Sequence, residues 1–430
     1  MSQRSRHLTE QALDRIAAPD GEGSRACLSV YAVAARAAAD AADARRAAGR
    51  ALGPLDGVVI TIKDLFGVQG EVTRAGSVVL ARTGDKATAD APAVARLRAA
   101  GAVIVAKTNM TEFAFSGVGL NPHFGTPGNP FDRARIPGGS TSGGAVACAD
   151  GIGTIAIGTD TGGSTRIPAA LCGLTGWKPT ARRIPLSGVH PLSPSLDSVG
   201  CMARSVAECA LADAVLAATS CEPLQPAELR RLRIGLLQGP VLSELDDQVT
   251  RRFSAALQRL AAAGCSDVRV SALSHMDAVN QRGGLAPPEA YHIHRELLAA
   301  HGDEVDPFVR SRMHGGANSS SPHQRANQED RARGIAAFDA VFDQYDVLAL
   351  PTTAIVAPTR EELRDPERLS TKNRLLLRNT SVANFFDLCA VSLPLLDGAA
   401  LPCGLMLMGR SGADKQLLRA AAAVEAALRA

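Results

Sequence analysis

The chain has 430 residues, of which 46% are apolar and 21% charged, a balance typical of a globular protein. Its formal net charge is +3, and its basic residues are spread along the chain instead of forming the concentrated patch of a nucleic-acid-binding protein. No apolar run approaches the roughly 20 residues that a membrane span requires, and the N-terminus lacks the apolar core of a signal peptide. Nine cysteines without framework spacing predict reduced thiols in a cytoplasmic protein, where they act mostly as small buried hydrophobic residues.

Helical and strand patterns alternate along the chain. Apolar periodicity predicts helices at 35–52, 90–101, 142–152, 204–218, 251–265 and 331–345. Short apolar runs predict strands at 57–62, 102–107, 153–160, 230–237, 267–273 and 346–353. This alternation predicts an α/β fold around a parallel or mixed sheet. The segment 310–324, rich in Gly, Ser and His, is predicted to be an irregular loop.

We find no internal repeat and no linker strong enough to divide the chain, so we expect a single domain over 1–430. The best alternative boundary is the stretch 221–230, "CEPLQPAELR".

Two glycine-rich runs hold the hydroxyl groups with the clearest chemical meaning. "PGGSTSGG" covers 137–144, and "TGGSTRIP" covers 161–168, directly after a predicted strand. Successive glycines allow backbone N–H groups to converge on an anion, and Ser164 lies at the end of such a run. A serine hydroxyl beside converging amides is suited to acyl transfer, although each run alone also fits a tight turn.

A serine nucleophile needs a base. None of the nine histidines lies in a distinctive setting, and His292 and His294 are two apart on a predicted helix, which argues against a shared metal site. Neither run matches the G-x-S-x-G pattern of a hydrolase elbow. Lys63 ends the apolar run "GVVITIK", where burial would lower its pKa far enough for it to act as a base. The competing interpretation is a strand-end lysine paired with Asp64.

Taken together, these features resemble the amidase signature family. The stretch from 137 to 180, "PGGSTSGGAVACADGIGTIAIGTDTGGSTRIPAALCGLTGWKPT", matches the family signature without gaps between its two key serines. Supporting matches are "LDGVVITIKDLFGV", "GAVIVAKTNMTEFAFSGVGLNPHFGTPGNP", "PLSPSLDSVGCMARS" and "LPCGLMLMG", so the resemblance covers roughly 55–410.

The resemblance implies a large central mixed β-sheet flanked by helices on both faces. It divides the domain into an N-terminal helical segment (1–54), a signature core (55–220) and a more variable half (221–430) that closes the substrate pocket. Ser164 would be the acylated nucleophile, Ser140 a bridging serine with a cis peptide bond to Gly139, and Lys63 the base. The backbone amides of Thr161, Gly162, Gly163 and Ser164 would form the oxyanion hole, and Arg166 would support their loop.

The expected activity is hydrolysis of a non-peptide carboxamide to a carboxylate plus ammonia or an amine. The family position that contacts substrate corresponds to Ala114, and we expect a small or polar amide, including urea- or carbamate-like compounds. Further candidates for the pocket wall are Tyr291, His292, His294, His314 and Thr352. We expect no metal, no cofactor, no nucleic acid and no membrane partner, and a homodimer remains open.

Two alternatives remain. The chain could be the glutaminase (A) subunit of a tRNA-dependent amidotransferase, which works with partner proteins. From a different class, the glycine-rich loops could bind a phosphate or nucleotide without catalysis, although neither G-x-x-x-x-G-K-[ST] nor G-x-G-x-x-G after a strand is present.

Overall fold

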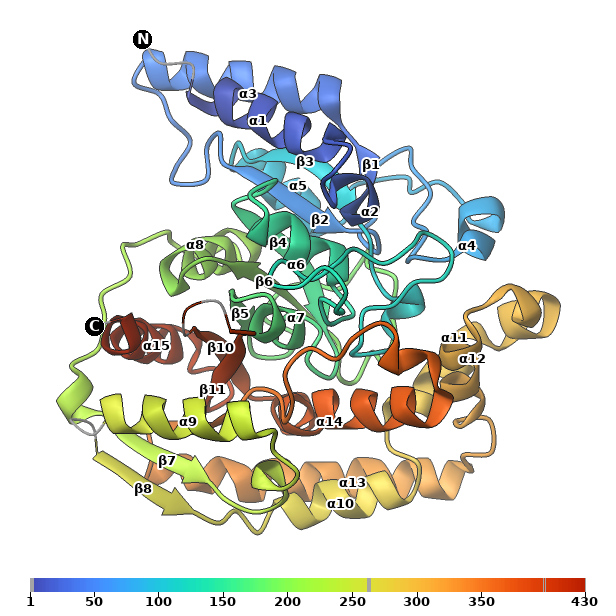
Figure 1. Cartoon of the computed structure of the whole chain (residues 1–430), viewed down its shortest axis with the longest axis vertical. Helices are drawn as coiled ribbons and strands as arrows, with labels where there is room; N and C mark the ends of the chain where they lie inside the picture. The colour runs from blue at the N-terminus through green and yellow to red at the C-terminus, as the bar shows by residue number, and fades with distance from the viewer. Residues whose placement is uncertain (1–3, 261–263, 397, 399, 430) are drawn as a thin grey trace.

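The computed structural model describes residues 4–260, 264–396, 398 and 400–429, and within them eleven strands form one sheet in the order β1-β3-β2-β4-β6-β5-β10-β11-β9-β7-β8 (Figure 1). The strands are β1 (Cys27–Val30), β2 (Val59–Lys63), β3 (Val103–Thr108), β4 (Ile155–Asp160), β5 (Thr175–Lys178), β6 (Ser198–Ala203), β7 (Arg233–Leu237), β8 (Gly264–Val268), β9 (Val347–Pro351), β10 (Cys389–Leu395) and β11 (Cys403–Gly409).

The sheet is mixed. β2 pairs in parallel with β3 and β4, and β7 pairs in parallel with β8 and β9, whereas the described strands between these two groups pair antiparallel. The predicted α/β fold with a large central mixed sheet is therefore confirmed.

Helices cover both faces of this sheet and bury its inner strands, such as β2, β3 and β4, on both sides. In β3, Val103 and Val105 pack towards α1, α3 and α6, whereas Ile104 faces the opposite core beneath α5 and α8. The helices are α1 (Arg4–Ala17), α2 (Gly23–Ala26), α3 (Ala32–Ala47), α4 (Val78–Thr83), α5 (Pro92–Ala99), α6 (Ser142–Ala149), α7 (Arg166–Leu171), α8 (Val206–Leu216), α9 (Asp247–Arg259), α10 (Leu273–Gln281), α11 (Ala286–His301), α12 (Pro307–His314), α13 (Ser321–Asp339), α14 (Pro366–Phe385) and α15 (Asp414–Arg429).

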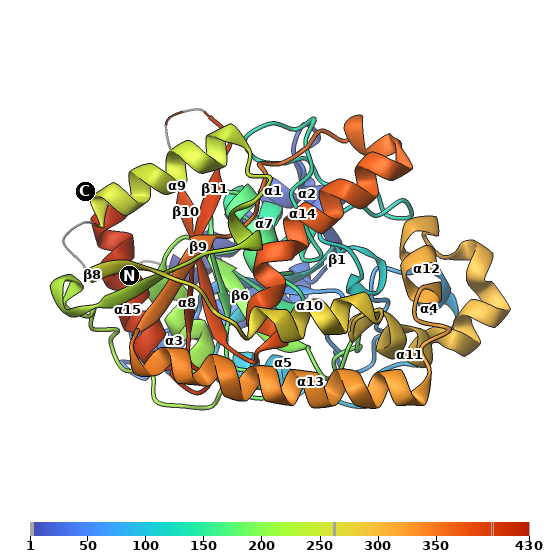
Figure 2. The same ribbon diagram turned by 90° about the horizontal axis from the view of Figure 1, so that it is seen from below.

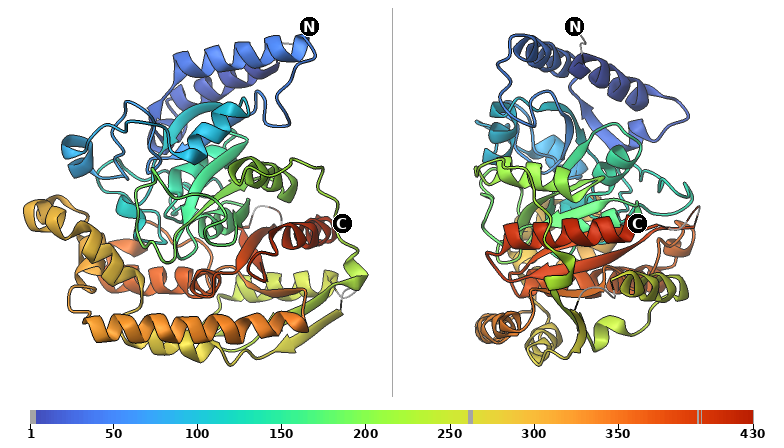
Figure 3. Two further views of the ribbon diagram at one scale, coloured as in Figure 1. Left: turned by 180° about the vertical axis from the view of Figure 1, so that it is seen from behind. Right: turned by 90° about the vertical axis from the view of Figure 1, so that its left-hand side faces the viewer.

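The second half of the chain adds a group of helices beside the sheet. α10 and α13 lie side by side with α14 next to them (Figure 2), and α11 and α12 project at one side of the molecule (Figure 3). β2 and β4 are parallel neighbours, so their carboxyl ends meet at one edge of the sheet. This edge, at Lys63 and Asp160, is where the candidate site forms.

The predicted loop at 310–324 is wrong for most of its length. α12 continues to His314, and α13 begins at Ser321 after Ser320, whose hydroxyl accepts a hydrogen bond from His323 N. A serine N-cap followed by Pro322 is a helix-start signal that the glycine and serine content of this stretch obscures. Of the helix predicted at 251–265, residues 261–263 lie outside the described part, and the structure has α9 at Asp247–Arg259 and a strand from Gly264.

Seven of the nine cysteines are buried, two are partly exposed, and none of the nine forms a disulfide. Among the described residues, no helix combines the length and apolarity needed to cross a bilayer. Within the same residues, no group of three or more His, Cys, Asp or Glu side chains is arranged to hold a metal ion.

Candidate active site

Lys63 is the last residue of β2, a central strand whose residues are all buried. Its Nζ lies 2.7 Å from Oγ of Ser140 and 3.1 Å from Oγ1 of Thr159. Burial lowers the pKa of Lys63 to about 7, although the carboxylates of Asp160 and Asp197 act in the opposite direction. The amine therefore titrates near neutral pH, where much of it is uncharged.

The first glycine-rich run brings Ser140 against this lysine. The peptide bond between Gly139 and Ser140 is cis, as the family resemblance implies. A Cβ atom on Gly139 would lie 2.6 Å from the backbone nitrogen of Gly119, so a side chain does not fit there. The glycine allows two backbone segments to meet at the point where Ser140 approaches Lys63.

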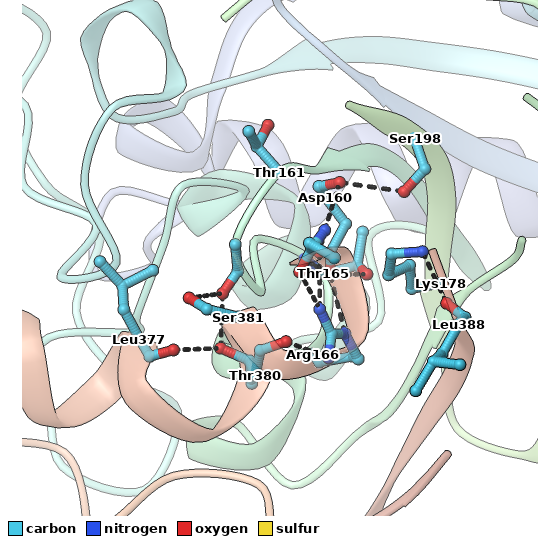
Figure 4. Close-up of polar contacts among 12 residues, drawn as sticks. Asp160, Thr161, Thr165, Arg166, Lys178, Ser198, Leu377, Thr380, Ser381 and Leu388 are labelled. Carbon is cyan, nitrogen blue, oxygen red and sulfur yellow. Dashed lines mark hydrogen bonds and ion pairs between the residues drawn. The ribbon is translucent and has the colours of Figure 1, made fainter. Parts of the chain in front are cut away.

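A buried ion pair holds the loop that carries the second glycine-rich run. Asp160 ends β4, Arg166 begins α7, and Nη2 of Arg166 lies 2.8 Å from Oδ1 of Asp160 with both side chains fully buried. Arg166 also donates to the carbonyl of Thr380 at 2.8 Å (Figure 4) and to Oδ1 of Asn384 at 2.7 Å, and both partners lie on α14. Arg166 thus supports the loop and ties it to the second half of the chain.

The carbonyl of Gly162 points towards α14, because it accepts hydrogen bonds from Oγ1 of Thr380 at 2.5 Å and from Oγ of Ser381 at 3.4 Å (Figure 4). In a trans peptide the C=O and the following N–H point in opposite directions, so the N–H of Gly163 points away from α14. Gly163 has φ of 134°, and a Cβ atom there would lie 2.2 Å from Oγ1 of Thr380. Only glycine fits this position without displacing α14.

A second carboxylate fixes the start of the same loop. Oγ1 of Thr161 donates to Oδ1 of Asp197 at 2.5 Å, and Oδ2 of Asp197 accepts from the backbone nitrogens of Leu192 and Ser193. Burial raises the pKa of Asp197 to about 6, against these hydrogen bonds. Asp197 therefore changes charge close to the pH at which Lys63 does.

A cavity of about 290 Å³ opens in front of the loop. Four of the residues that the sequence singled out line it: Ala114, Thr161, Gly162 and Ser164. Its other walls come mainly from the second half of the chain and are largely apolar. They include Leu192, Leu196, Met276, Leu285, Leu377 and Phe385, together with the polar residues Ser116, Asn280, Arg312, Ser381 and Asn384.

Lys63 and Ser140 lie behind the cavity wall, fully buried. The two glycine-rich runs meet where the N–H of Thr141 donates to the carbonyl of Ser164 at 3.4 Å. Among the described residues, none forms a hydrogen bond with Oγ of Ser164, so its expected bond with Ser140 is not present in this structure. The structure thus brings Lys63 and Ser140 into contact and places Ser164 at the cavity wall beside them.

The further pocket candidates lie elsewhere. Oγ1 of Thr352 is buried against Oγ of Ser392, and the rings of Tyr291 and His314 lie 5.9 Å apart outside the cavity. His292 lines a different hollow.

His294 packs on Phe113 and lies 3.0 Å from His190 through their Nε2 atoms. Its neighbour on α11, His292, is exposed, so the two histidines face different sides as predicted.

Three residues of the site were not expected from the sequence. Asp197 lies within the quoted motif "PLSPSLDSVGCMARS", so its position carried a signal. Asn384 and Arg312 lie far along the chain, and Arg312 falls inside the segment predicted as a loop. Nothing in their local pattern indicates that they face the cavity.

Comparisons with known proteins agree with this architecture. The family model described as Amidase matches residues 7–418. The 2-amino-5-chloromuconic acid deaminase of Comamonas testosteroni is 37% identical over 405 residues, covering 91% of this chain and 86% of the relative. The glutamyl-tRNA(Gln) amidotransferase A subunit of Roseiflexus sp. (strain RS-1) is 36% identical over 454 residues, covering 96% of this chain and 91% of the relative.

Among solved structures, one is described as "An unexpected vestigial protein complex reveals the evolutionary origins of an s-triazine catabolic enzyme", in an inhibitor-bound complex. It matches with a TM-score of 0.88 and 31% identity over 98% of this chain and 95% of that chain. The fold and these relatives define the class of protein: a hydrolase that acts on carbon–nitrogen bonds. The chain belongs to the Amidase family.

Proposed function

We propose that this protein hydrolyses a small or polar amide through an acyl-enzyme on Ser164, with Ser140 and Lys63 as a proton relay. The observation that carries the proposal is the 2.7 Å contact between Nζ of Lys63 and Oγ of Ser140, at a lysine whose pKa burial lowers to about 7. A neutral amine at this position can accept a proton, which an ordinary surface lysine near pH 7 cannot do.

The first half of the reaction forms the acyl-enzyme. Lys63 accepts the proton of Ser140, Ser140 accepts the proton of Ser164, and Oγ of Ser164 attacks the amide carbon. The oxyanion that forms accepts hydrogen bonds from backbone N–H groups of the loop 161–164. When the C–N bond breaks, the proton returns through Ser140 to the leaving nitrogen, which departs as ammonia or an amine.

The second half releases the product. Water attacks the ester carbon, gives its proton to the relay, and Oγ of Ser164 leaves and takes that proton back. The relay needs Oγ of Ser164 to come within hydrogen-bond distance of Ser140. Catalytic hydrogen bonds of this kind are commonly long in substrate-free enzymes and shorten in the substrate complex.

The test is to quench the enzyme during turnover of a slow ester substrate and locate the acyl group by mass spectrometry. We expect the label on the peptide containing Ser164 and no label on Ser164→Ala, whose amide hydrolysis should fall by at least about 10³-fold. A label on another residue, or retention of a tenth of the activity by Ser164→Ala, would refute the proposal.

A second candidate is the glutaminase role, because several relatives are named as the A subunit of glutamyl-tRNA(Gln) amidotransferase. Glutamine carries an α-ammonium group that a specific pocket would pair with a carboxylate. Among the described residues that line the cavity, none is acidic.

The cavity therefore favours an amide without an ammonium group. Comparison of glutamine with glutaramate, which lacks only the α-amino group, tests this point. We expect at least tenfold higher kcat/KM for glutaramate, whereas a preference for glutamine would favour the glutaminase role.

A further inference from the structure

We propose that the cavity in front of Ser164 takes amides that bear a carboxylate, and that Arg312 binds this carboxylate; the inference rests on the proposed hydrolysis at Ser164. Arg312 is the charged side chain among the described residues that line the cavity. The remaining walls offer apolar surface and neutral hydroxyl and amide groups. A single cation in such a cavity selects for a ligand with one negative group.

The guanidinium of Arg312 has capacity to bind a ligand. Its Nε donates to the carbonyl of Phe115 at 3.0 Å, and its Cζ lies 4.5 Å from the centre of the Phe115 ring. Among the described residues, no carboxylate lies within ion-pair distance of Arg312, and its two terminal nitrogens have no hydrogen-bond acceptor. These two nitrogens form the side of the fork that binds a carboxylate with two parallel hydrogen bonds.

The protein holds Arg312 in place from both sides. Asp306 is the N-cap of α12; its side chain accepts from Phe308 N, and its own N–H donates to the buried carboxylate of Glu112 at 2.7 Å. Val309 and Met313 of the same helix are fully buried. Arg312 thus lies on a rigid element, and its Nε contact with Phe115 fixes the orientation of the guanidinium.

The charge on Arg312 persists at working pH. Burial lowers the pKa of Arg312 to about 10, which leaves the group protonated at pH 7 to 9. The same removal from water makes a cation without a carboxylate partner costly and strengthens its attraction for an anion. A carboxylate on the substrate can form the ion pair with Arg312 that no described carboxylate of the protein forms.

The experiment compares monoamides of dicarboxylic acids, from malonamate to adipamate, with neutral isosteres in which an isopropyl group replaces the carboxylate. Succinamate and 4-methylpentanamide form one such pair. We expect the wild-type enzyme to favour the acid in at least one pair by about 100-fold in kcat/KM, the factor that a charge-assisted contact provides. Equal turnover of acid and neutral amide in every pair would overturn the inference.

Three variants separate binding from folding. Arg312→Met should lower kcat/KM for the preferred acid by about 100-fold and change kcat/KM for its neutral isostere by less than threefold. For the acid, kcat/KM of Arg312→Lys should lie between the values of the wild-type enzyme and Arg312→Met. Arg310→Met is the matched control, because Arg310 lies on the same helix and pairs with Asp303 at the surface. An equal loss on both substrates in Arg312→Met would show a merely structural role and refute the inference.

Calorimetry with the matching dicarboxylate, which is the hydrolysis product, gives a readout independent of turnover. We expect binding to the wild-type protein and to Arg310→Met, and at least tenfold weaker binding to Arg312→Met. Unchanged binding in Arg312→Met would overturn the inference while leaving hydrolysis at Ser164 intact. Conversely, Arg312-dependent binding without hydrolysis of any amide would refute the proposed function and leave the inference standing.

Discussion

Nζ of Lys63 and Oγ of Ser140 lie 2.7 Å apart in a region where both side chains are fully buried. An ammonium group there loses its hydration and gains no direct carboxylate partner among the described residues, because its two close neighbours are hydroxyl groups. The fold therefore favours the neutral amine by burial, and the same burial excludes water that could compete for the proton. These two effects make the contact suitable for proton transfer.

The first prediction concerns the pH dependence of turnover. Because the neutral form of Lys63 is the proposed base and its pKa is about 7, kcat/KM should rise about tenfold per pH unit below pH 7 and level off above about pH 8. The measurement is kcat/KM for one amide from pH 5 to 9. A flat profile over this range would contradict the assignment of Lys63.

Asp197→Asn serves as the control for that profile, because the pKa of Asp197, about 6, lies close to that of Lys63. The carboxylate of Asp197 favours the charged amine, so its removal should move the rising limb to lower pH without abolishing it. If the limb disappeared in Asp197→Asn, the ionisation would belong to Asp197 and not to Lys63.

The second prediction concerns stability. The pKa of Lys63 is about 7 in the folded protein, whereas the ordinary value of 10.5 applies to the unfolded chain, which therefore binds the extra proton between these two values. Stability from this group is complete above pH 10.5, falls as pH drops, and reaches its minimum below pH 7. From pH 9 to pH 6 the loss amounts to roughly 3 kcal/mol, at ~1.4 kcal/mol per pH unit over the titrating range.

Lys63→Met removes this titration while filling a similar volume. We expect the variant to be inactive, and to gain stability relative to the wild-type protein as pH falls from 9 to 6. The measurement is urea unfolding of both proteins at the two pH values. A difference in unfolding free energy that stays constant with pH would show that Lys63 keeps an ordinary pKa in the folded state.

How much of this site the sequence could predict depended on the distance between its parts along the chain. Lys63, Ser140 and Ser164 each follow or interrupt a recognisable local pattern, and the two glycine-rich runs are joined by one helix and one strand. The pairing of β2 with β4 then brings their carboxyl ends together, as parallel neighbours must. Local pattern marked each residue as a candidate, the family resemblance implied that they act together, and the sheet topology explains why they meet.

The far wall of the cavity could not be predicted in this way. Arg312 and Asn384 reach the site only because α12 and α14 pack around the cavity, and the rotation of each helix about its axis decides which side chain faces inward. The segment around Arg312 also contains Gly315, Gly316 and a run of serines, which favoured a loop interpretation over two closely spaced helices. Tertiary packing determines which residues of this kind face the cavity, and the periodicity of a single sequence does not report that packing.

The third prediction separates the hydroxyl groups of the first glycine-rich run. Ser140→Ala removes the group that contacts Lys63 and should lower kcat/KM by roughly 10²–10⁴-fold, the range for loss of general acid–base catalysis. Ser142→Ala is the matched control, because Oγ of Ser142 is buried without a hydrogen-bond partner among the described residues and its loss should be neutral or slightly stabilising. The measurement is steady-state kcat/KM of the two variants. Equal losses of kcat/KM in both would show that the glycine-rich run acts only through its packing.

The last prediction concerns the ion pair between Asp160 and Arg166. Arg166→Met leaves the carboxylate of Asp160 buried without its partner, and breaking such a pair costs about 3–5 kcal/mol of unfolding free energy. The variant should also lose turnover, because Arg166 ties the loop of Ser164 to α14. Arg374→Met is the control, since its pair with Glu244 is half exposed and contributes at most about 1 kcal/mol.

The pH dependence of this loss distinguishes an uncompensated charge from lost packing. In the wild-type protein Arg166 helps to hold the pKa of Asp160 well below its usual range, against the effect of burial. Without Arg166 burial raises that pKa, so acid protonates Asp160 in the folded variant and removes the buried charge. The stability deficit of Arg166→Met should therefore shrink as pH falls from 8 to 5 in urea unfolding. A deficit that stays constant, or one no larger than that of Arg374→Met, would show that the pair does not support the loop electrostatically.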